Sequence, residues 1–514
     1  MWAAGRGRPK DLIITPGWLK TSPWRDDLLN IDLYQTATGL LEKIQKKEIS
    51  ALELLEVHLQ KIEASNSEIN AVVVTDAERA TERAKAADEA LTRGESWGPL
   101  HGLPMTVKDA FEVEGLASTG GSPKWKDHFP VKNAEAVQRF VDAGAIVFGK
   151  TNVPLLSGDF QTFNDIYGIT NNPWDVTKTP GGSSGGAAAA LAAGMTPLEI
   201  GSDIGGSIRT PAHFCGVYGH KPSYGIISMR GHIPPPPGCV NDGDTLSVAG
   251  PLARSPEDLE LALSLLVAPK MMDSVAWQME LPPSRHETLN GFRVAVWLDD
   301  PYCFVDRTIA DVIQRVADEL AKHGVKIVET HPDISLEMND RIFWDLVPPV
   351  IATGFPPNVI DSMRKLLDSS EPDDDSLPVR QARGALIPHK DWLSADERRH
   401  RVRVKWHELF HDYDVLLCPT TVTSAFEHDH SPDFFQRKLI VNGEPRPYFD
   451  LMVWAGLAIN AQLPATVAPI GLSEDGLPVG IQIIGPYLED RTTIKFAELL
   501  EKVYGGFNQP PKIN

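Results

Sequence analysis

Cysteine is scarce in this chain. Only four occur in 514 residues, at positions with no paired spacing: Cys215, Cys239, Cys303 and Cys418. Four cysteines are too few to cross-link a chain of this length, which excludes a scaffold held by disulfide bonds. We therefore expect a reducing, cytoplasmic compartment. Cys215 and Cys239 are predicted to be small packing residues.

Long apolar segments are also missing. A membrane-spanning helix needs about 20 uninterrupted apolar residues. The longest apolar stretch, residues 346–360, is interrupted by Pro348, Pro349, Pro356 and Pro357. The basic start of the chain is not followed by an apolar region, so neither a secretory signal nor a membrane span is expected.

Basic residues are too few for a protein that binds nucleic acid as its main partner. Asp and Glu number 69 against 49 Lys and Arg, which gives a formal net charge of -20. Nucleic-acid backbones and anionic membranes recruit clustered Lys and Arg, so neither is expected as a partner. Hydrophobic residues make up 42% of the chain, enough for the core of a globular protein.

Alternating strand-like and helical patterns predict an α/β fold. Strand-like runs fall at residues 71–74, 105–107, 145–148, 293–298 and 325–328, and helical spacing follows a capping box at residues 50–53 and recurs over residues 309–320. This alternation favours a largely buried sheet with helices around it. No Gly-, Ser- or Pro-rich linker divides the chain. We therefore expect one domain at residues 33–505, with a variable insertion near residues 335–395, an N-terminal extension at 1–32 and a tail at 506–514.

Lys108 is the first candidate for chemistry. It ends the segment GLPMTVKD at residues 102–109, a short apolar strand in which its ammonium would be largely desolvated. A lone lysine beside Asp109 would ordinarily extend to the surface instead.

Two Gly/Ser-rich segments are the other candidates. Residues 180–186 read PGGSSGG and precede an alanine run, so the backbone can approach another group closely before a helix begins. A flexible loop is the alternative, and a P-loop is excluded because the Lys-Ser/Thr pair is missing. Residues 201–209, GSDIGGSIR, place small residues before Ser207, where several N–H groups can point at one oxyanion.

Together and in this order, the three segments resemble the amidase signature family. The resemblance covers about residues 33–503 and implies an α/β fold with a large mixed, mostly buried β-sheet flanked by helices on both faces. Further landmarks of the family are Thr151-Asn152-Val153-Pro154, Asn172-Pro173-Trp174, Lys221-Pro222-Ser223, Asp414 to Thr420, Leu463-Pro464-Ala465 and Gly476 to Pro486.

The resemblance implies a Ser-cisSer-Lys triad. Ser207 would be the nucleophile, Ser183, after a cis peptide bond, would relay the proton, and Lys108 would be the ultimate base. Lysine can act so only when neutral, which requires lowering its pKa of about 10.4 by roughly 3 units, near 4 kcal/mol. No metal or organic cofactor is implied. The oxyanion hole would consist of the backbone N–H groups of Ile204, Gly205, Gly206 and Ser207.

The implied function is cleavage of C–N bonds in a small-molecule substrate. We expect neutral, hydrophobic or aromatic amides, anilides or carbamates (urethanes) as substrates and esters as side substrates. Homodimers are common in the family, but the sequence itself does not decide the oligomeric state. The segments 342–367 and 233–237 are apolar and suggest an apolar acyl or leaving group, with core packing as the alternative.

The acyl pocket itself departs from the family pattern. Many members carry Glu-Phe after the Asn-x-Pro landmark, whereas this chain has Leu155-Leu156. Candidate substrate-binding residues are Gly158, Asp159 and Ser184.

Four other interpretations compete with this one. The segment 181–185 also matches G-x-S-x-G, in which Ser183 would attack as in α/β-hydrolases. Some family members act only as the amidotransferase component of a glutamine-dependent complex, and a member without its triad would be a scaffold. His407, Glu408 and His411 form H-E-x-x-H, typical of zinc hydrolases, with Glu427, His428 or His430 as a third ligand; a solvated amphipathic helix is the alternative.

Overall fold

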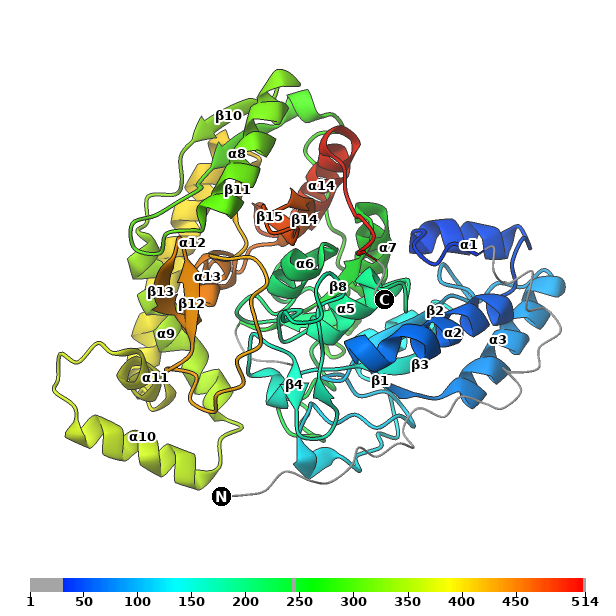
Figure 1. The fold of residues 1–514 in the computed structure, drawn as a ribbon, viewed down its shortest axis with the longest axis horizontal. Coiled ribbons are helices and arrows are strands. Elements are labelled where there is room, and N and C mark those ends of the chain that lie inside the picture. Colours follow the sequence, from blue (N-terminus) through cyan, green and yellow to red (C-terminus); the bar gives the residue numbers. More distant parts are fainter. Residues whose placement is uncertain (1–30, 243–245, 512–514) are drawn as a thin grey trace.

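The computed structural model describes residues 31–242 and 246–511, so residues 1–30 of the expected N-terminal extension lie outside the described residues. The largest sheet is mixed: its first three strands are parallel, and all its other neighbouring pairs are antiparallel. In spatial order its eight strands are β10 (Lys326–Glu329), β9 (Arg293–Val296), β11 (Val415–Pro419), β15 (Pro478–Ile484), β14 (Ala465–Leu472), β7 (Tyr218–Lys221), β8 (Val248–Ala253) and β6 (Leu198–Asp203) (Figure 1).

A second sheet of three strands adjoins β6. Its order is β1 (Val72–Thr75), β3 (Ile146–Thr151) and β2 (Pro104–Lys108). Thr106 joins β2 to the larger sheet, because its N–H donates to Thr196 Oγ1 at 3.1 Å and its hydroxyl donates to Glu199 Oε1 at 2.5 Å. The middle of β2 is therefore fixed beside the start of β6. Two short hairpins complete the strands: β4 (Phe163–Asn164) with β5 (Gly168–Ile169), and β12 (Lys438–Val441) with β13 (Glu444–Pro447).

Helices surround these sheets, and the α/β fold with a large mixed sheet is confirmed (Figure 1). The capping box at Ser50 and Glu53 is present. The described helices are α1 (Ala37–Gln45), α2 (Ala51–Ile69), α3 (Ala77–Thr92), α4 (Glu135–Asp142), α5 (Gly185–Ala192), α6 (Arg209–Cys215), α7 (Pro256–Leu266), α8 (Arg307–Lys322), α9 (Leu336–Ala352), α10 (Pro357–Ser369), α11 (Leu377–Ala385), α12 (His389–Asp412), α13 (Val453–Asn460) and α14 (Asp490–Tyr504).

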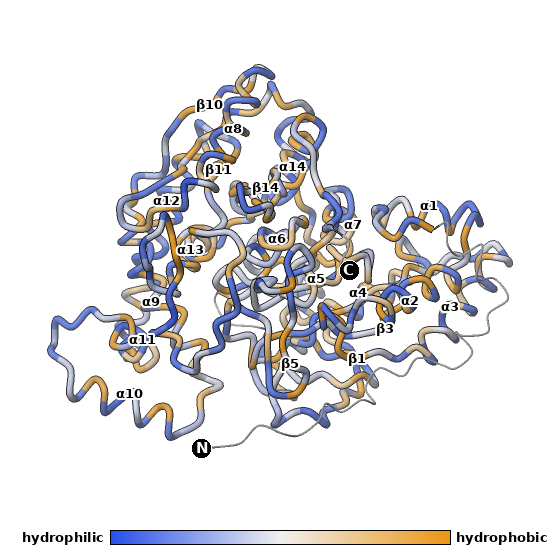
Figure 2. The backbone as a smooth tube through the Cα atoms, viewed as in Figure 1, coloured by the Kyte–Doolittle hydropathy of each residue, from blue (hydrophilic) through white to orange (hydrophobic). Residues whose placement is uncertain are grey.

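The expected insertion is helical. Residues 335–395 form α9, α10, α11 and the start of α12, and α9 continues through Pro348 and Pro349. Helix α10 has no fully buried residue. Its hydropathy alternates along its length at the edge of the molecule (Figure 2). Within the described residues, no helix has the length and apolar composition that crossing a membrane requires.

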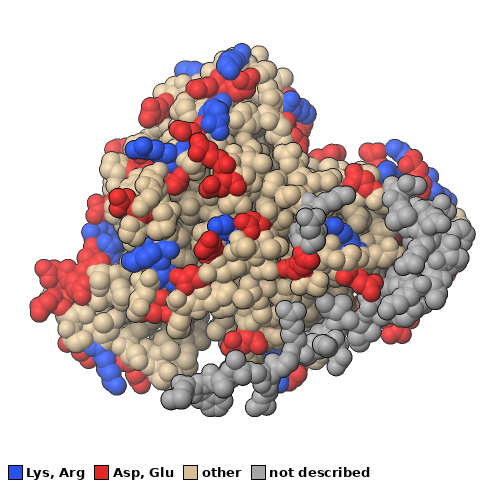
Figure 3. All heavy atoms as spheres, viewed as in Figure 1, with Lys and Arg blue, Asp and Glu red and all other residues tan. Residues whose placement is uncertain are grey.

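The surface carries charges of both signs. Figure 3 shows Lys and Arg scattered among Asp and Glu, without a continuous basic area on the face drawn. The cysteines are free, and Cys215, Cys303 and Cys418 are buried. Cys239 is exposed, so the prediction that it packs in the interior is wrong. It follows the proline run 234–237, which carries the chain to the surface.

Candidate active site

Lys108 ends strand β2 with its side chain fully buried. Its Nζ lies 2.8 Å from Ser183 Oγ and 3.0 Å from Ser202 Oγ. Burial lowers the pKa of Lys108 to about 7, although the carboxylates of Asp203 and Glu199 oppose this shift. The expectation that this amine is desolvated at the end of an apolar strand is confirmed, and the surface-exposed alternative is wrong.

Ser183 precedes α5 and is 1% exposed. The Gly182–Ser183 peptide bond is cis. Gly182 fits here because a Cβ at this position would lie 2.5 Å from the carbonyl oxygen of Asp159. The alanine run that follows forms the buried helix α5, as the sequence predicts.

Ser207 lies between β6 and α6 and is 7% exposed, the most accessible of the three side chains. The Ser184 N–H donates to the Ser207 carbonyl at 3.0 Å, which places the segments of Ser183 and Ser207 side by side. Exposure thus increases from Lys108 through Ser183 to Ser207. This order suits a base kept from water and a nucleophile that meets a substrate.

The backbone before Ser207 presents N–H groups. The Gly206 N–H donates to Asp203 Oδ1 at 2.8 Å. Among the described residues, the N–H groups of Ile204, Gly205 and Ser207 have no such acceptor. Three of the four expected oxyanion donors are therefore unengaged, and the fourth is directed to a carboxylate.

Asp203 and Arg209 form a fully buried ion pair that shapes this loop. Arg209 Nη2 lies 2.8 Å from Asp203 Oδ1, and the Ile208 N–H donates to Asp203 Oδ2 at 3.0 Å. Although burial opposes ionisation, Arg209 and these N–H groups lower the pKa of Asp203 to about 2. Arg209 also donates to the Ala455 carbonyl at 2.8 Å. Arg209 is therefore held in a buried structural ion pair.

The candidate substrate-binding residues differ in their surroundings. Gly158 is exposed, whereas Ser184 is fully buried. The carboxylate of Asp159 is already bound, by Arg437 Nη1 at 2.7 Å and the Tyr448 hydroxyl at 2.6 Å. Asp159 thereby ties the segment behind Gly182 to the C-terminal part of the chain.

Apolar side chains pack beside residues 204–207, the segment that ends at Ser207 and is called the nucleophile loop below. A Cβ at Gly205 would lie 3.5 Å from Phe343 Cζ and 3.6 Å from Met452 Sδ. Phe343 belongs to α9, within the expected insertion. The next residue, Trp344, belongs to a cluster of rings centred on Phe449. The centroids of Trp344 and Phe449 lie 5.4 Å apart, and Phe160 and Phe435 also contact Phe449.

Comparison with known proteins identifies the family. The amidase family model matches residues 53–494. The chain belongs to the amidase signature family. The glutamyl-tRNA(Gln) amidotransferase A subunit of Acaryochloris marina is 30% identical over 501 residues, which cover 92% of this chain and 99% of the relative. The indoleacetamide hydrolase of Bradyrhizobium diazoefficiens is 34% identical over 473 residues, covering 88% and 84%. A solved bacterial aryl acylamidase of the amidase signature family superposes with a TM-score of 0.76 at 26% identity, covering 92% and 96%.

Two polar residues near Lys108, Ser183 and Ser207 were not predicted from the sequence. Ser202 lies in the segment 201–209, where nothing distinguishes it from the other small residues that precede Ser207. His232 follows Ser202 by 30 residues, and its Nε2 lies 2.8 Å from Ser202 Oγ. The one sequence feature that could have pointed to His232 is its position directly before the apolar, proline-rich segment 233–237.

The competing zinc site finds little support in the geometry. His407, Glu408 and His411 lie exposed on α12, and Glu408 binds Lys405 at 3.1 Å. In the part of the chain that the structure describes, no three His, Cys, Asp or Glu side chains are grouped to hold a metal ion.

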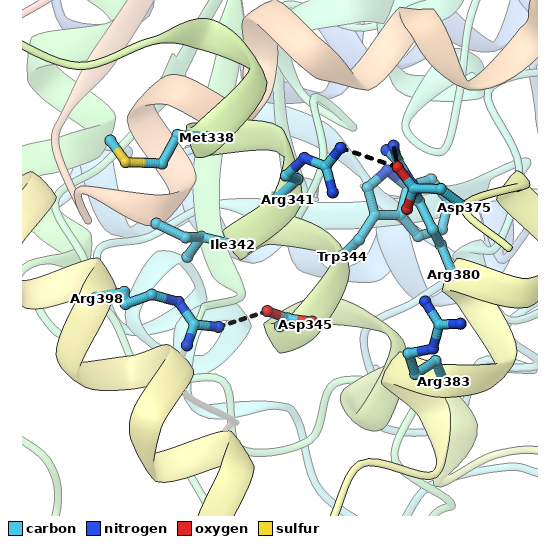
Figure 4. A pocket seen from close by; sticks show the side chains of 9 residues that line it. All are labelled: Met338, Arg341, Ile342, Trp344, Asp345, Asp375, Arg380, Arg383 and Arg398. Carbon is cyan, nitrogen blue, oxygen red and sulfur yellow. Dashed lines mark hydrogen bonds and ion pairs between the residues drawn. The ribbon is translucent and has the colours of Figure 1, made fainter. Parts of the chain in front are cut away.

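A cavity of about 340 Å³ lies away from the triad, between α9, α11 and α12 (Figure 4). Four arginines and two aspartates line it. Both aspartates are paired with arginines: Asp345 with Arg398 at 2.6 Å, and Asp375 with Arg341 at 2.9 Å. None of the sequence-predicted site residues lines it.

Replacing Asp203 by Asn is expected to destabilise the fold by about 3–5 kcal/mol at pH 7, because Arg209 loses its buried counter-ion. The folded-state pKa of about 2 lies below the usual value of about 3.9. This contribution is therefore complete above pH 5 and is lost as the pH falls toward 2. Urea unfolding measures both effects.

Two further variants control this measurement. Asp475→Asn, in an exposed turn, should leave the unfolding midpoint unchanged. Asp203→Asn combined with Arg209→Met should cost less than the sum of the single changes, because the two side chains interact. Additive losses would contradict the proposed coupling of the pair.

Proposed function

We propose that this amidase-family protein is a serine hydrolase that cleaves neutral, hydrophobic or aromatic amides, anilides or carbamates through an acyl-enzyme, with esters as side substrates. The observation that carries this proposal is the fully buried amine of Lys108, 2.8 Å from Ser183 and beside the segment of Ser207. A buried amine with a pKa of about 7 is neutral in a large fraction of molecules at neutral pH. It can therefore accept a proton.

In the first step, the Ser207 hydroxyl attacks the substrate carbonyl. Its proton passes to Ser183 Oγ while the Ser183 proton passes to Lys108 Nζ, so the serine becomes nucleophilic only as it reacts. The tetrahedral oxyanion would accept hydrogen bonds from the N–H groups of Ile204, Gly205 and Ser207, and each donor lowers the barrier by about 3–4 kcal/mol. We assign the Gly206 N–H to Asp203 rather than to the oxyanion.

The intermediate then collapses and expels the amine, which takes a proton back from Lys108 through Ser183. Water attacks the acyl-enzyme by the same proton path and releases the acid. A carbamate passes through the same oxyanion; the alcohol or amine departs, and carbon dioxide is lost later. No step requires a metal ion or an organic cofactor.

The substrate class is inferred from the apolar wall. Phe343 and Met452 flank Gly205, so a group bound beside the oxyanion donors would contact carbon and sulfur rather than charge. The names of an indoleacetamide hydrolase and an aryl acylamidase among the relatives agree with neutral aromatic substrates. We propose that the Gly158–Asp159 backbone borders this pocket and that Ser184 positions the nucleophile segment.

A second candidate function is that of the amidotransferase component, or A subunit, of a multi-protein complex. Several relatives carry that name and match this chain over nearly their whole length. In that case a glutamine amide would be the substrate, and partner proteins would be required.

The proposal also covers the compartment, the oligomeric state and the domain bounds of the protein. We place the protein in the cytoplasm as a homodimer with one amidase domain at residues 33–505. The free cysteines support a reducing compartment.

The triad is tested by substitution. With an acyl p-nitroanilide at pH 8.5, Ser207→Ala should abolish release of p-nitroaniline, and Ser183→Ala and Lys108→Ala should reduce kcat by at least 100-fold, because each removes one link of proton transfer. A chelator should have no effect. Turnover that survives Ser207→Ala but not Ser183→Ala would favour the nucleophile-elbow mechanism.

The pH dependence follows from Lys108. Because burial lowers the pKa of Lys108 to about 7 and the neutral amine is the active form, kcat/KM should rise between pH 6 and 8 and level off above. Stopped-time assays with a slow anilide keep chemistry rate-limiting. A flat profile from pH 6 to 10 would rule out a titrating lysine.

A substrate panel separates the two candidate functions. The purified protein alone should hydrolyse phenylacetyl or benzoyl anilides and aryl carbamates at least 100-fold faster than glutamine, because the pocket offers apolar contacts. Phe343→Ala should lower this preference mainly through KM. Hydrolysis of glutamine that appears only with added partner proteins would favour the amidotransferase.

A further inference from the structure

A chain of polar groups continues beyond Lys108, and the mechanism above does not use it. Lys108 Nζ lies 3.0 Å from Ser202 Oγ, and Ser202 Oγ lies 2.8 Å from His232 Nε2. The other ring nitrogen, His232 Nδ1, lies 2.8 Å from the Pro234 carbonyl oxygen. The chain thus ends at a backbone acceptor.

The Pro234 carbonyl fixes the direction of every hydrogen bond in this chain. A carbonyl can only accept, so His232 Nδ1 must carry a proton. Burial lowers the pKa of His232 to about 3, so its ring is neutral and Nε2 keeps a lone pair. The Ser202 hydroxyl therefore donates to Nε2, and its oxygen is left to accept an N–H from Lys108.

The direction of the hydrogen bond between Lys108 and Ser202 decides whether the lone pair of Lys108 is free. A neutral amine has two N–H donors and one lone pair. When Ser202 accepts an N–H, the lone pair remains free for the Ser183 proton at 2.8 Å. If the Ser202 hydroxyl could turn, it would donate to that lone pair and compete with Ser183.

We propose that His232 is a positioning residue that acts through Ser202 to keep the lone pair of Lys108 directed at Ser183. This inference rests on the proposed role of Lys108 as the base. His232 plays the part for Lys108 that an orienting group plays for the base of other serine hydrolases.

The backbone around His232 is built to hold this position. The Ile233 N–H donates to the Ala110 carbonyl at 2.7 Å, and the Glu112 N–H donates to the Gly231 carbonyl at 2.9 Å. The Phe111 ring packs edge-on against the imidazole, with centroids 5.0 Å apart. The residues directly after Lys108 therefore hold His232 in place.

The charged groups around the two side chains are few. Glu199 and Asp203, both on β6, face Lys108 and raise its pKa against the effect of burial. Lys108 is the charge that acts on His232. From β3, Lys150 binds Asp109, the residue after Lys108, at 3.3 Å.

Two substitutions separate the donor and acceptor roles of the ring. In His232→Asn the amide N–H can replace Nδ1–H toward Pro234, but nothing reaches Ser202. In His232→Gln the side-chain oxygen can replace Nε2 as the acceptor. We expect His232→Asn to lower kcat about 10- to 100-fold with little change in KM, and His232→Gln to restore most of it.

The pH profile supplies a second readout. In His232→Asn, the Ser202 hydroxyl can donate to the neutral amine, which favours the uncharged form of Lys108. The apparent pKa of kcat should therefore fall, although kcat itself is lower. A residue that only stabilised the fold would not move this value.

The relay through Ser202 is tested by a double-mutant cycle. Once Ser202→Ala removes the intermediate hydroxyl, adding His232→Asn should change kcat by less than about threefold. His331→Asn is the matched control, because His331 Nδ1 also lies 2.8 Å from a proline carbonyl, that of Pro332, without contact to the triad. It should leave kcat unchanged.

Labelling with a fluorophosphonate, located by mass spectrometry, measures serine activation without any amide substrate. The inference is supported if labelling of Ser207 depends on Lys108 and slows 10- to 100-fold in His232→Asn, but does not slow further when His232→Asn is added to Ser202→Ala. This outcome supports it even if amides are not hydrolysed. Unchanged Lys108-dependent labelling in His232→Asn overturns the inference and leaves the proposed function intact. Labelling of Ser207 that does not need Lys108 overturns both.

Discussion

The fully buried amine of Lys108 constrains the rest of the site. Removing an ammonium from water costs several kcal/mol unless a counter-ion compensates it. No carboxylate forms an ion pair with Lys108 among the described residues, and its hydrogen-bond partners are the hydroxyls of Ser183 and Ser202. Hydroxyls can accept from an amine and donate to it, so they suit a group that must exist in both protonation states.

Nearby carboxylates are engaged elsewhere, which keeps the pKa of Lys108 near neutrality. Asp203 binds Arg209 and three backbone N–H groups of the nucleophile loop, and Asp109 binds Lys150. Burial raises the pKa of Glu199 to about 7, so its charge is only partial at neutral pH. An unpaired carboxylate beside Lys108 would favour the protonated amine and raise the pKa of Lys108.

Local patterns predicted much of the architecture and of the site. The periodicity of residues 309–320 located α8, the apolar runs located β2, β3, β9 and β10, and the motifs led to Lys108, Ser183 and Ser207. The order of strands could not be predicted, because β7, β8 and β6 pair with neighbours that no short-range pattern specifies. His232 was not predicted because a single histidine carries no periodicity. It comes near Lys108 only when residues 231–233 align with residues 110–112.

The nucleophile loop depends on the C-terminal part of the chain. Arg209 contacts the Ala455 carbonyl and Gln482, and Phe343 and Met452 lie against Gly205, so α13, β15 and α9 hold this loop. The polar chain from Ser183 to His232, in contrast, lies entirely within the first half of the sequence. Substitutions in α9 can therefore change the apolar surroundings of Gly205 while the hydrogen bonds around Lys108 stay the same.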